Sequence, residues 1–421
     1  MLTHQTVLPN GLRVLATEMS QARSITIALF VGVGSRLESS EQSGVSHFTE
    51  HMLFKGTERR PTSREVSETI EAVGGVLNAE TSKELTVYWV KVAQAHWQLA
   101  IDLLADLVLH SRFSPDEVER ERKVILEELS MIQDEPGDWV HVLIDELLWD
   151  GSPLAWDVAG RPETVRGITR EDLLRHVSQH YRPDNAAVSV AGPVPETELV
   201  AEIERQFGGW NGTALGARTP TSGSPAQARL RIEEKRGTQE HICIAVPGIA
   251  LADPDRYPLD LFSIVLGEGM SSRLFLELRD RRGLAYDVHS YVNYYRDAGS
   301  VVVYVGVEPE QAETAVAAIV EQIAKLKADL SASELSKAKE YWKGRLELSM
   351  EDTHSVATWA GAQQMLLGHV YTVEEVMDCV DRVTIEDVRR VAGRLFTPES
   401  LRLAAVGPLR KGERLSRWLR L

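Results

Sequence analysis

Two histidines and a glutamate stand within five residues in the stretch SGVSHFTEHMLFKGT, as His47, Glu50 and His51. A helix is expected over about 44–55, because the glycine that follows favours a helix end. At about 100° per residue, the three side chains share one arc of about 100° on that helix. The two imidazoles could bind one zinc ion, and Glu50 could take a proton from a water molecule beside it. The alternative is a solvated polar face, because so short a pattern also arises by chance.

A catalytic zinc site needs a third protein ligand, and the segment SPDEVERERKVILEELSMI (114–132) offers two carboxylates. Its Ser-Pro-x-Glu start predicts a helix N-terminus. Glu121 and Glu128 lie about 60–80° from Val118, on one flank of the buried stripe that it begins, whereas Glu127 points to solvent. Carboxylates beside an apolar face need a partner, because buried charge is costly. A metal would supply that partner, and the alternative for either residue is an ion pair with Arg or Lys.

These segments resemble the pitrilysin and insulin-degrading enzyme family of metallopeptidases, in which His-x-x-Glu-His is the inverted zinc motif. The family includes the mitochondrial processing peptidase, and the chain is most similar to bacterial members of processing-peptidase type along essentially its whole length. Glu128 stands at the separation of the family's distal ligand, inside a match to its second glutamate motif, ERKVILEE. The resemblance implies one zinc ion per chain, held by His47, His51 and Glu128. It also implies that Glu50 is the general base and that Glu121 is the carboxylate that supports the site.

Two further segments match parts of the family that hold the substrate. GGVLNAETSKELTVYW (74–89) resembles the active-site edge strand, and Asn78 and Ala79 match the residues that line it. Such a strand binds an extended peptide by strand addition; a plain turn at Asn78 is the alternative. In SSRLFLELRDRRGLAY, Arg279 and Tyr286 match the family's residues that bind the substrate backbone and polarise the scissile carbonyl. Without the resemblance, a surface ion pair and a core aromatic would be the simpler interpretations of this pair.

The elements that position these residues occur twice along the chain. Residues 168–194 align without a gap on 383–409, and each copy predicts a Thr-capped helix, a turn at proline and a strand that ends in Gly-Pro. The stretch NGTALGARTPTSGSPAQA between them is typical of a linker. We therefore expect two halves of similar fold, 1–215 and 229–421, joined by a linker at 216–228.

Strand-like runs such as SITIALFVGVGS are not regularly interleaved with helix-like runs such as HWQLAIDLLADLVLHS. This order favours an α+β fold, in which each half has a mainly antiparallel sheet packed by helices. The second half has no His-x-x-Glu-His, and its segment LSKAKEYWKGRLEL lacks paired inward carboxylates, so no second metal site is expected. The resemblance implies that the two halves form half of a clamshell chamber. Because two chains are needed to close such a chamber, a homodimer is expected.

Composition excludes several other classes of protein. The net charge of −16 argues against nucleic-acid binding; it could favour peptides that carry basic residues, or serve only solubility. No apolar run approaches twenty residues, so no membrane association is expected. The start of the sequence lacks the features of a secretion signal, and two cysteines make no disulfide framework. A cytoplasmic location with reduced, buried cysteines is therefore expected.

The sequence thus predicts a zinc endopeptidase that hydrolyses short unfolded peptides inside a chamber. One alternative is a non-catalytic scaffold or partner subunit, but such relatives lose ligands or base, and this chain retains all of them. The other is a non-haem iron enzyme, because two histidines and a carboxylate also suit iron; that chemistry leaves Glu50 unexplained. A second i, i+4 histidine pair, His176 and His180, has no glutamate in the position of a base, and we expect a structural role for it.

Overall fold

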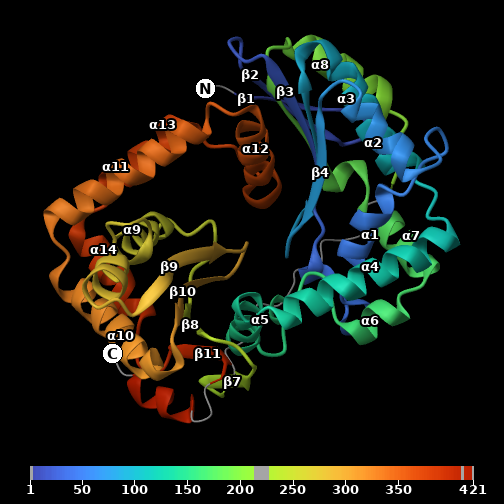
Figure 1. Ribbon diagram of the computed structural model, residues 1–421. Coiled ribbons are helices and arrows are strands. Elements are labelled where there is room, and N and C mark those ends of the chain that lie inside the picture. The colour runs from blue at the N-terminus through green and yellow to red at the C-terminus, as the bar shows by residue number, and fades with distance from the viewer. Residues whose placement is uncertain (1–2, 213–226, 409–411, 420–421) are drawn as a thin grey trace. The chain divides into compact units, whose positions relative to one another are not determined.

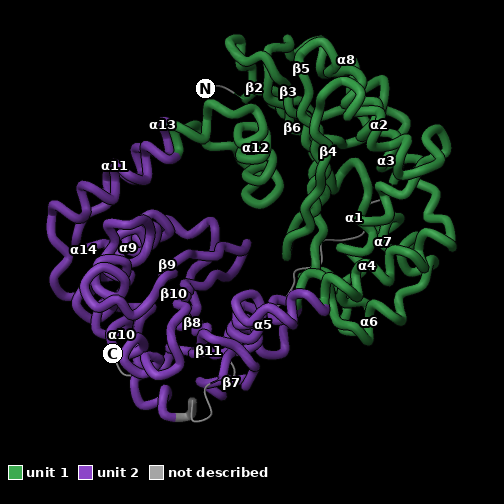
Figure 2. Tube along the Cα trace, in the orientation of Figure 1, with its two compact units in different colours: residues 1–129, 157–220, 346–373 green, residues 130–156, 221–345, 374–421 purple. Residues whose placement is uncertain are grey.

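The computed structural model describes residues 3–212, 227–408 and 412–419 (Figure 1). The chain forms two compact units, each made of three separate segments (Figure 2). Unit 1 contains residues 1–129, 157–220 and 346–373, and unit 2 contains residues 130–156, 221–345 and 374–421. The expected linker at 216–228 lies almost wholly outside the described residues.

Unit 1 is built on a six-stranded sheet in the order β1-β2-β6-β3-β5-β4. Its strands are β1 (Thr3–Val7), β2 (Arg13–Glu18), β3 (Ser24–Val31), β4 (Val76–Thr81), β5 (Thr86–Ala93) and β6 (Ala186–Gly192). Every neighbouring pair is antiparallel except β2 and β6. Strand β3 is buried along almost its whole length, as expected for a strand with helices on both faces of its sheet. Strand β4 is at the edge of the sheet, so the backbone groups on one of its sides form no hydrogen bonds with another strand of this sheet.

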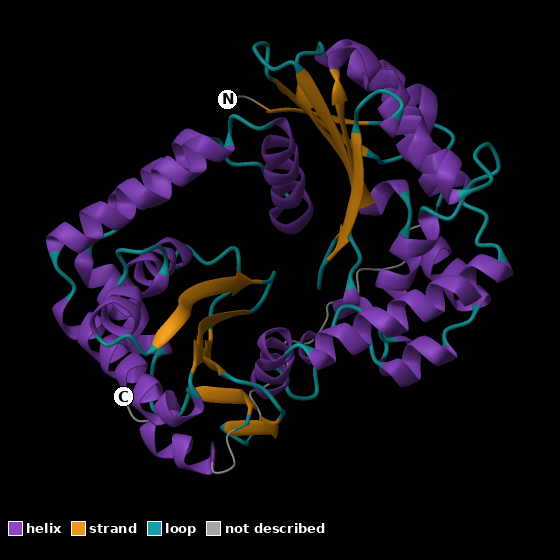
Figure 3. Ribbon diagram, in the orientation of Figure 1, coloured by secondary structure: helices purple, strands orange, loops and turns teal. Residues whose placement is uncertain are grey.

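Helices cover both faces of this sheet (Figures 1 and 3). One face carries α3 (Trp97–His110), with α2 (Ser63–Glu71) and α8 (Glu196–Phe207) beside it, and the other carries α12 (Thr353–Leu367). The close fit of α12 depends on Gly361, because a Cβ there would lie 2.0 Å from Cε2 of the buried Phe30. The remaining helices are α1 (Val45–Leu53), α4 (Pro115–Asp134), whose residues from 130 onward belong to unit 2, α6 (Pro162–Gly167) and α7 (Arg170–His180).

Unit 2 has a five-stranded sheet in the order β7-β11-β8-β10-β9, of which only β7 and β11 are parallel. Its strands are β7 (Leu230–Glu234), β8 (Glu240–Pro247), β9 (Ala285–Tyr294), β10 (Gly299–Val307) and β11 (Arg402–Gly407). Helix α5 (Pro136–Leu148) packs on β8 and β11. The other helices are α9 (Arg256–Gly267), α10 (Ala312–Asp329), α11 (Ala332–Ser349), α13 (Val373–Arg382) and α14 (Ile385–Leu395).

The strand order of unit 2 repeats that of unit 1 from β2 onward, and the sequence repeat explains why. Its two copies form α7 with β6 and α14 with β11. Each helix begins with the predicted threonine cap, in which Thr169 and Thr384 accept hydrogen bonds from the N–H groups of Asp172 and Asp387, both at 3.2 Å. The predicted α+β fold, with two mainly antiparallel sheets packed by helices, is confirmed.

Within the described residues, no helix combines the length and the apolar character needed to cross a membrane. Both cysteines are free; Cys243 is buried as predicted, and Cys379 is half-buried.

Candidate metal centre

Helix α1 presents His47, Glu50 and His51 on one side, and its other residues are buried. Phe48, Thr49 and Met52 have no exposed surface, whereas the side chains of His47 and His51 are 19% and 18% exposed. The helix begins after Gly44, which has a φ of 95°. The predicted helix is therefore present, and its motif faces away from the core of unit 1.

A carboxylate fixes the first turn of α1. Glu38 accepts hydrogen bonds from the backbone N–H groups of Gly44, at 2.7 Å, and Ser46, at 2.8 Å. These are groups that a helix start leaves without partners, and negative charge is favourable there. Burial nevertheless raises the pKa of Glu38 to about 7, although both N–H groups lower it. The start of the motif helix thus depends on a buried carboxyl group.

The predicted third ligand lies beside the two histidines. Glu128 Oε2 is 3.9 Å from His47 Nε2 and 3.7 Å from His51 Nε2, and one ligand atom of each residue lies within 4.8 Å of the others. Ligand atoms on one tetrahedral zinc ion are about 3.3–3.5 Å apart, because zinc–ligand bonds are about 2.0–2.2 Å long. Two imidazole nitrogens and a carboxylate oxygen at these distances suit zinc in both number and chemistry. The described residues contain no other group of three His, Cys, Asp or Glu that could hold a metal.

Glu121 lies behind the histidines, as the helix geometry of α4 predicts. Its Oε2 is 3.1 Å from His51 Nδ1, and Lys55 Nζ is 2.7 Å from its Oε1. A hydrogen bond from Nδ1–H to this carboxylate fixes the tautomer of His51 and leaves Nε2 unprotonated toward Glu128. Burial raises the pKa of Glu121, but the hydrogen bonds from His51 and Lys55 lower it by more than burial raises it. The pKa of Glu121 is therefore below its ordinary value. Glu121 therefore supports the ligand His51 and also forms the ion pair with a lysine that was the alternative.

The pKa values of His47 and Glu50 are also shifted in directions that suit a metal ligand and a general base. Burial, together with the charge of His51, lowers the pKa of His47 to about 4, so its imidazole is neutral near pH 7, as metal binding requires. Burial raises the pKa of Glu50, although a hydrogen bond from Thr81 and the charge of His51 oppose this effect. A carboxyl group with a raised pKa can both take and return a proton. Thr81, which no sequence motif predicted, holds Glu50 from strand β4 by a hydrogen bond.

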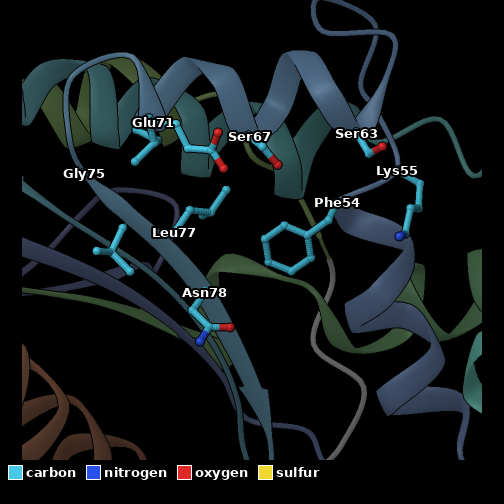
Figure 4. Close-up of a pocket in the computed structure, with 10 residues that line it drawn as sticks. Phe54, Lys55, Ser63, Ser67, Glu71, Gly75, Leu77 and Asn78 are labelled. Atoms are coloured by element: carbon cyan, nitrogen blue, oxygen red, sulfur yellow. The ribbon is translucent and has the colours of Figure 1, made fainter. Parts of the chain in front are cut away.

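Strand β4 forms the edge beside this group. Asn78 is exposed and Ala79 is half-buried, and Asn78 Oδ1 accepts a hydrogen bond from the N–H of Ala79 at 2.8 Å. The predicted edge strand is thus present, and Thr81 at its end contacts Glu50. A cavity of about 410 Å³ borders the same strand, between α2 and the end of α1 (Figure 4). Its lining includes Phe54, Ile70 and Leu77, with Lys55 and Glu71 as charged residues.

Arg279 and Tyr286 contact each other in unit 2. Arg279 lies on a π-helical segment, Phe275–Arg281; its Nη1 donates to the backbone oxygen of Tyr286 at 2.9 Å, and its guanidinium lies 4.5 Å from the centre of the tyrosine ring. Tyr286 is 76% exposed. The simpler interpretations of this pair are therefore wrong: the tyrosine is no core aromatic, and the arginine has no ion pair among the described residues.

The second histidine pair has the structural setting expected for it. The rings of His176 and His180 lie 4.8 Å apart, and His176 also contacts Tyr181. Burial, together with the charge of His180, lowers the pKa of His176 to about 3, so it is neutral near pH 7. Neither residue belongs to a metal-binding group in the described part of the chain.

Comparison with family models finds two matches. Residues 13–160 match the model of insulinase, peptidase family M16, and residues 167–341 match the peptidase M16 inactive domain. The first match contains all the residues of the candidate metal centre. The second covers much of unit 2, where no metal site was expected.

Comparison with individual proteins extends the likeness to the whole chain. The uncharacterized zinc protease YmxG of Bacillus subtilis is 36% identical over 402 residues, which are 95% of this chain and 97% of that protein. The crystal structure of a protease from Helicobacter pylori is 26% identical with a TM-score of 0.91, over 97% and 99% of the two chains. A chain of Complex III2 from Candida albicans, 19% identical, has a TM-score of 0.85 over 99% and 100% of the chains, which shows the fold alone. The enzyme class predicted from the motif, a metalloprotease, is confirmed. This chain belongs to peptidase family M16, the insulinase family.

Proposed function

We propose that this chain is a zinc endopeptidase in which His47, His51 and Glu128 hold the metal and Glu50 is the general base. The observation that carries the proposal is the convergence of three ligand atoms, from α1 and α4, within 4.8 Å of one another. Glu50 stands one residue before His51 on the same half-buried side of α1. Relatives named zinc proteases support the choice of zinc over iron.

The chemistry divides between the metal and the side chains. When bound, zinc lowers the pKa of a water molecule and polarises the substrate carbonyl as a Lewis acid. Glu50 takes the proton of the attacking water on its carboxylate and returns it to the leaving amine. Thr81 holds that carboxylate by a hydrogen bond. Glu121 keeps the His51 ring in the orientation that binding needs.

The exposed edge of β4 is the proposed binding place for the peptide. An extended peptide there forms main-chain hydrogen bonds as an added strand, beside Asn78 and Ala79. The neighbouring cavity, lined by Phe54, Ile70 and Leu77, receives an apolar side chain and adds selectivity. Arg279 and Tyr286 bind the substrate backbone and stabilise the developing oxyanion. This mode of binding requires an extended chain, so the substrates are unfolded peptides.

The proposed assembly is a cytoplasmic homodimer that encloses a chamber, with one zinc ion in each chain. A chamber admits short peptides and excludes folded proteins. The alternative is a non-catalytic partner subunit, since a chain of Complex III2 shares the fold. Retention of three ligand atoms and of Glu50 in one group favours the peptidase.

The first test compares the wild type with Glu50→Gln, both zinc-loaded, on an internally quenched unstructured peptide. We expect cleavage to fall by at least about a hundredfold, with the zinc content unchanged by mass spectrometry. Glu127→Gln is the matched control, because Glu127 lies beside the ligand Glu128 and is exposed. A wild type that binds zinc but cleaves no peptide from a broad library would favour the non-catalytic subunit instead.

A further inference from the structure

Unit 2 contains a cavity of about 470 Å³ that shares no residue with the metal centre. It lies between helix α9, strand β9 and helix α11. Its polar lining includes Asp260 from α9, Glu268 directly after α9, Tyr291 from β9 and Trp342 from α11, and Ile264 adds apolar surface. A cavity that joins two carboxylates to an indole ring and a phenol ring has the character of a ligand site.

The cavity occupies the place that corresponds to the metal centre of unit 1. Strand β9 is the counterpart of β4, because the order β7-β11-β8-β10-β9 repeats β2-β6-β3-β5-β4. Helix α9 follows β8 as α1 follows β3, and both helices lead into a loop with a glycine of positive φ, 116° at Gly56 and 79° at Gly269. Helices α4 and α11 are likewise counterparts, each preceded by a serine. The same three elements therefore surround the metal centre and the cavity.

In unit 2, other residues occupy the positions of the metal ligands. With Gly56 set on Gly269, Asp260 takes the position of His47 and Ile264 that of His51. With the first residues of α4 and α11 set together, Arg345 takes the position of Glu128 and Trp342 that of Ile125. A carboxylate, an alkyl group and a guanidinium do not form a zinc site. The cavity of unit 2 would therefore receive a ligand other than zinc.

The contacts of the two carboxylates leave them able to receive a cation. Asp260 Oδ1 accepts a hydrogen bond from the Tyr294 hydroxyl at 2.6 Å. Neither Asp260 nor Glu268 forms an ion pair within the described residues. Arg256, one turn before Asp260, donates instead to the backbone oxygen of Leu251 at 3.0 Å and to a tyrosine hydroxyl. Burial raises the pKa of Asp260 to about 7, although hydrogen bonds from Tyr294 and Trp342 and the charge of Arg256 lower it. Burial also raises the pKa of Glu268, although a hydrogen bond from Ser263 and the charge of Arg345 oppose this effect.

We propose that this cavity binds an alkyl guanidinium or alkylammonium group. The carboxylates of Asp260 and Glu268 would neutralise the charge by charge-assisted hydrogen bonds. The indole of Trp342 is the aromatic surface that best attracts a cation, while Ile264 and Tyr291 would contact the alkyl chain. The volume lies within the range of small-molecule sites.

The cation has two chemical sources: a free small molecule, or an arginine or lysine side chain of a bound peptide. The second source rests on the proposed peptidase function, and the first does not. Binding should therefore be measured without catalysis, on the full-length Glu50→Gln chain freed of metal. Failure of cleavage and failure of cation binding are then separate results.

The direct test is calorimetry with butylguanidine and with butylurea, its neutral counterpart of nearly the same shape. We expect saturable binding of butylguanidine and at least about tenfold weaker binding of butylurea. Adding Asp260→Asn should weaken butylguanidine binding by at least about tenfold. Adding Glu310→Gln should change nothing, because Glu310 is an exposed acid of unit 2 outside the cavity. Adding His47→Ala should also change nothing, since the metal centre is a different site.

One more variant and one more ligand complete the calorimetry. Trp342→Leu removes the indole without touching a carboxylate and should also weaken binding, with folding of each variant checked by circular dichroism. A peptide with one arginine, compared with its citrulline analogue, identifies the source: tighter binding than butylguanidine points to a peptide side chain, and binding of butylguanidine alone points to a free small molecule. The proposal would be overturned if butylguanidine bound with equal affinity to the unaltered cavity, to Asp260→Asn and to Trp342→Leu. Loss of butylguanidine binding with His47→Ala would also overturn it.

Discussion

At the scale of single residues, the candidate centre depends on Glu121, which is not a proposed ligand but contacts the ligand His51. Glu121 is only 8% exposed and joins His51 to Lys55. Removing it with Glu121→Ala would free the His51 ring to rotate and would leave the Lys55 ammonium without this carboxylate. We expect zinc affinity to fall by about 10–100-fold, measured by competition with a chelator. Glu127→Ala on the same helix is the control, and equal affinities for the two variants would contradict a supporting role for Glu121.

A second residue gives a prediction about stability and pH. The pKa of Glu38 is about 7 in the folded chain against about 4.3 for an unfolded glutamate. Because the folded state holds the proton more tightly, this group stabilises the fold fully below about pH 4.3, and the contribution is lost as the pH rises through about 7. Relative to Glu38→Gln, which cannot ionise, the wild type should lose about 3 kcal/mol between pH 4 and pH 8. Urea unfolding at both pH values measures the difference, and a constant gap between the two proteins would refute it.

The sequence was sufficient to predict the residues whose relation is local. His47, Glu50 and His51 share a helix face, and the two glutamates of α4 follow from the same periodicity. Thr81 and Lys55 were not predicted, although both lie within segments already recognised. Their contacts with Glu50 and Glu121 depend on how separate elements pack, and that information is absent from local spacing.

At the scale of elements, Gly361 allows α12 to approach the unit 1 sheet. Gly361→Ala places a methyl group against the ring of Phe30, in a core that has no room for it. We expect the free energy of unfolding to fall by about 1–3 kcal/mol. Gly393→Ala in α14 is a matched control, because a Cβ there meets nothing within 4 Å, and it should stabilise the helix by up to about 1 kcal/mol. Thermal unfolding of both variants checks the contrast; a loss of equal size in each would remove the argument for close packing.

The elements themselves were largely predictable, but some of their partners were not. Capped helices and β-branched strands, such as α7 with β6, carry local signals that the structure reproduces. By contrast, α12 belongs to unit 1 although it lies between β10 and β11 of unit 2 in the sequence, and α5 belongs to unit 2 although it follows α4. Each is a helix with an apolar face. Such a face predicts that the helix is buried on one side, but it does not predict which sheet the helix packs on.

At the scale of the whole molecule, the proposed mechanism requires a residue of unit 2 to act on chemistry in unit 1. Tyr286 is 76% exposed and carries the Arg279 guanidinium on its ring. Tyr286→Phe removes one proposed oxyanion donor, so kcat should fall by about 10²–10³ with the zinc content unchanged. Tyr341→Phe, at another exposed tyrosine of unit 2, should have no such effect. A normal kcat for Tyr286→Phe would remove this residue from the mechanism.

The net charge of the chain should influence which peptides are cleaved, and this long-range effect can be separated from that of a local site. A chain with a charge of −16 should attract basic peptides and cleave them faster than matched acidic ones at low salt. The ratio of the two kcat/KM values should fall as salt rises, because the screening length shrinks from about 30 Å at 0.01 M to about 8 Å at 0.15 M. Asp260→Asn changes the charge only to −15 (−16 + 1), so a preference that comes from the field survives this substitution. A preference that Asp260→Asn abolishes, and that salt barely affects, comes instead from the cavity of unit 2; equal cleavage of both peptides at low salt refutes selection by charge.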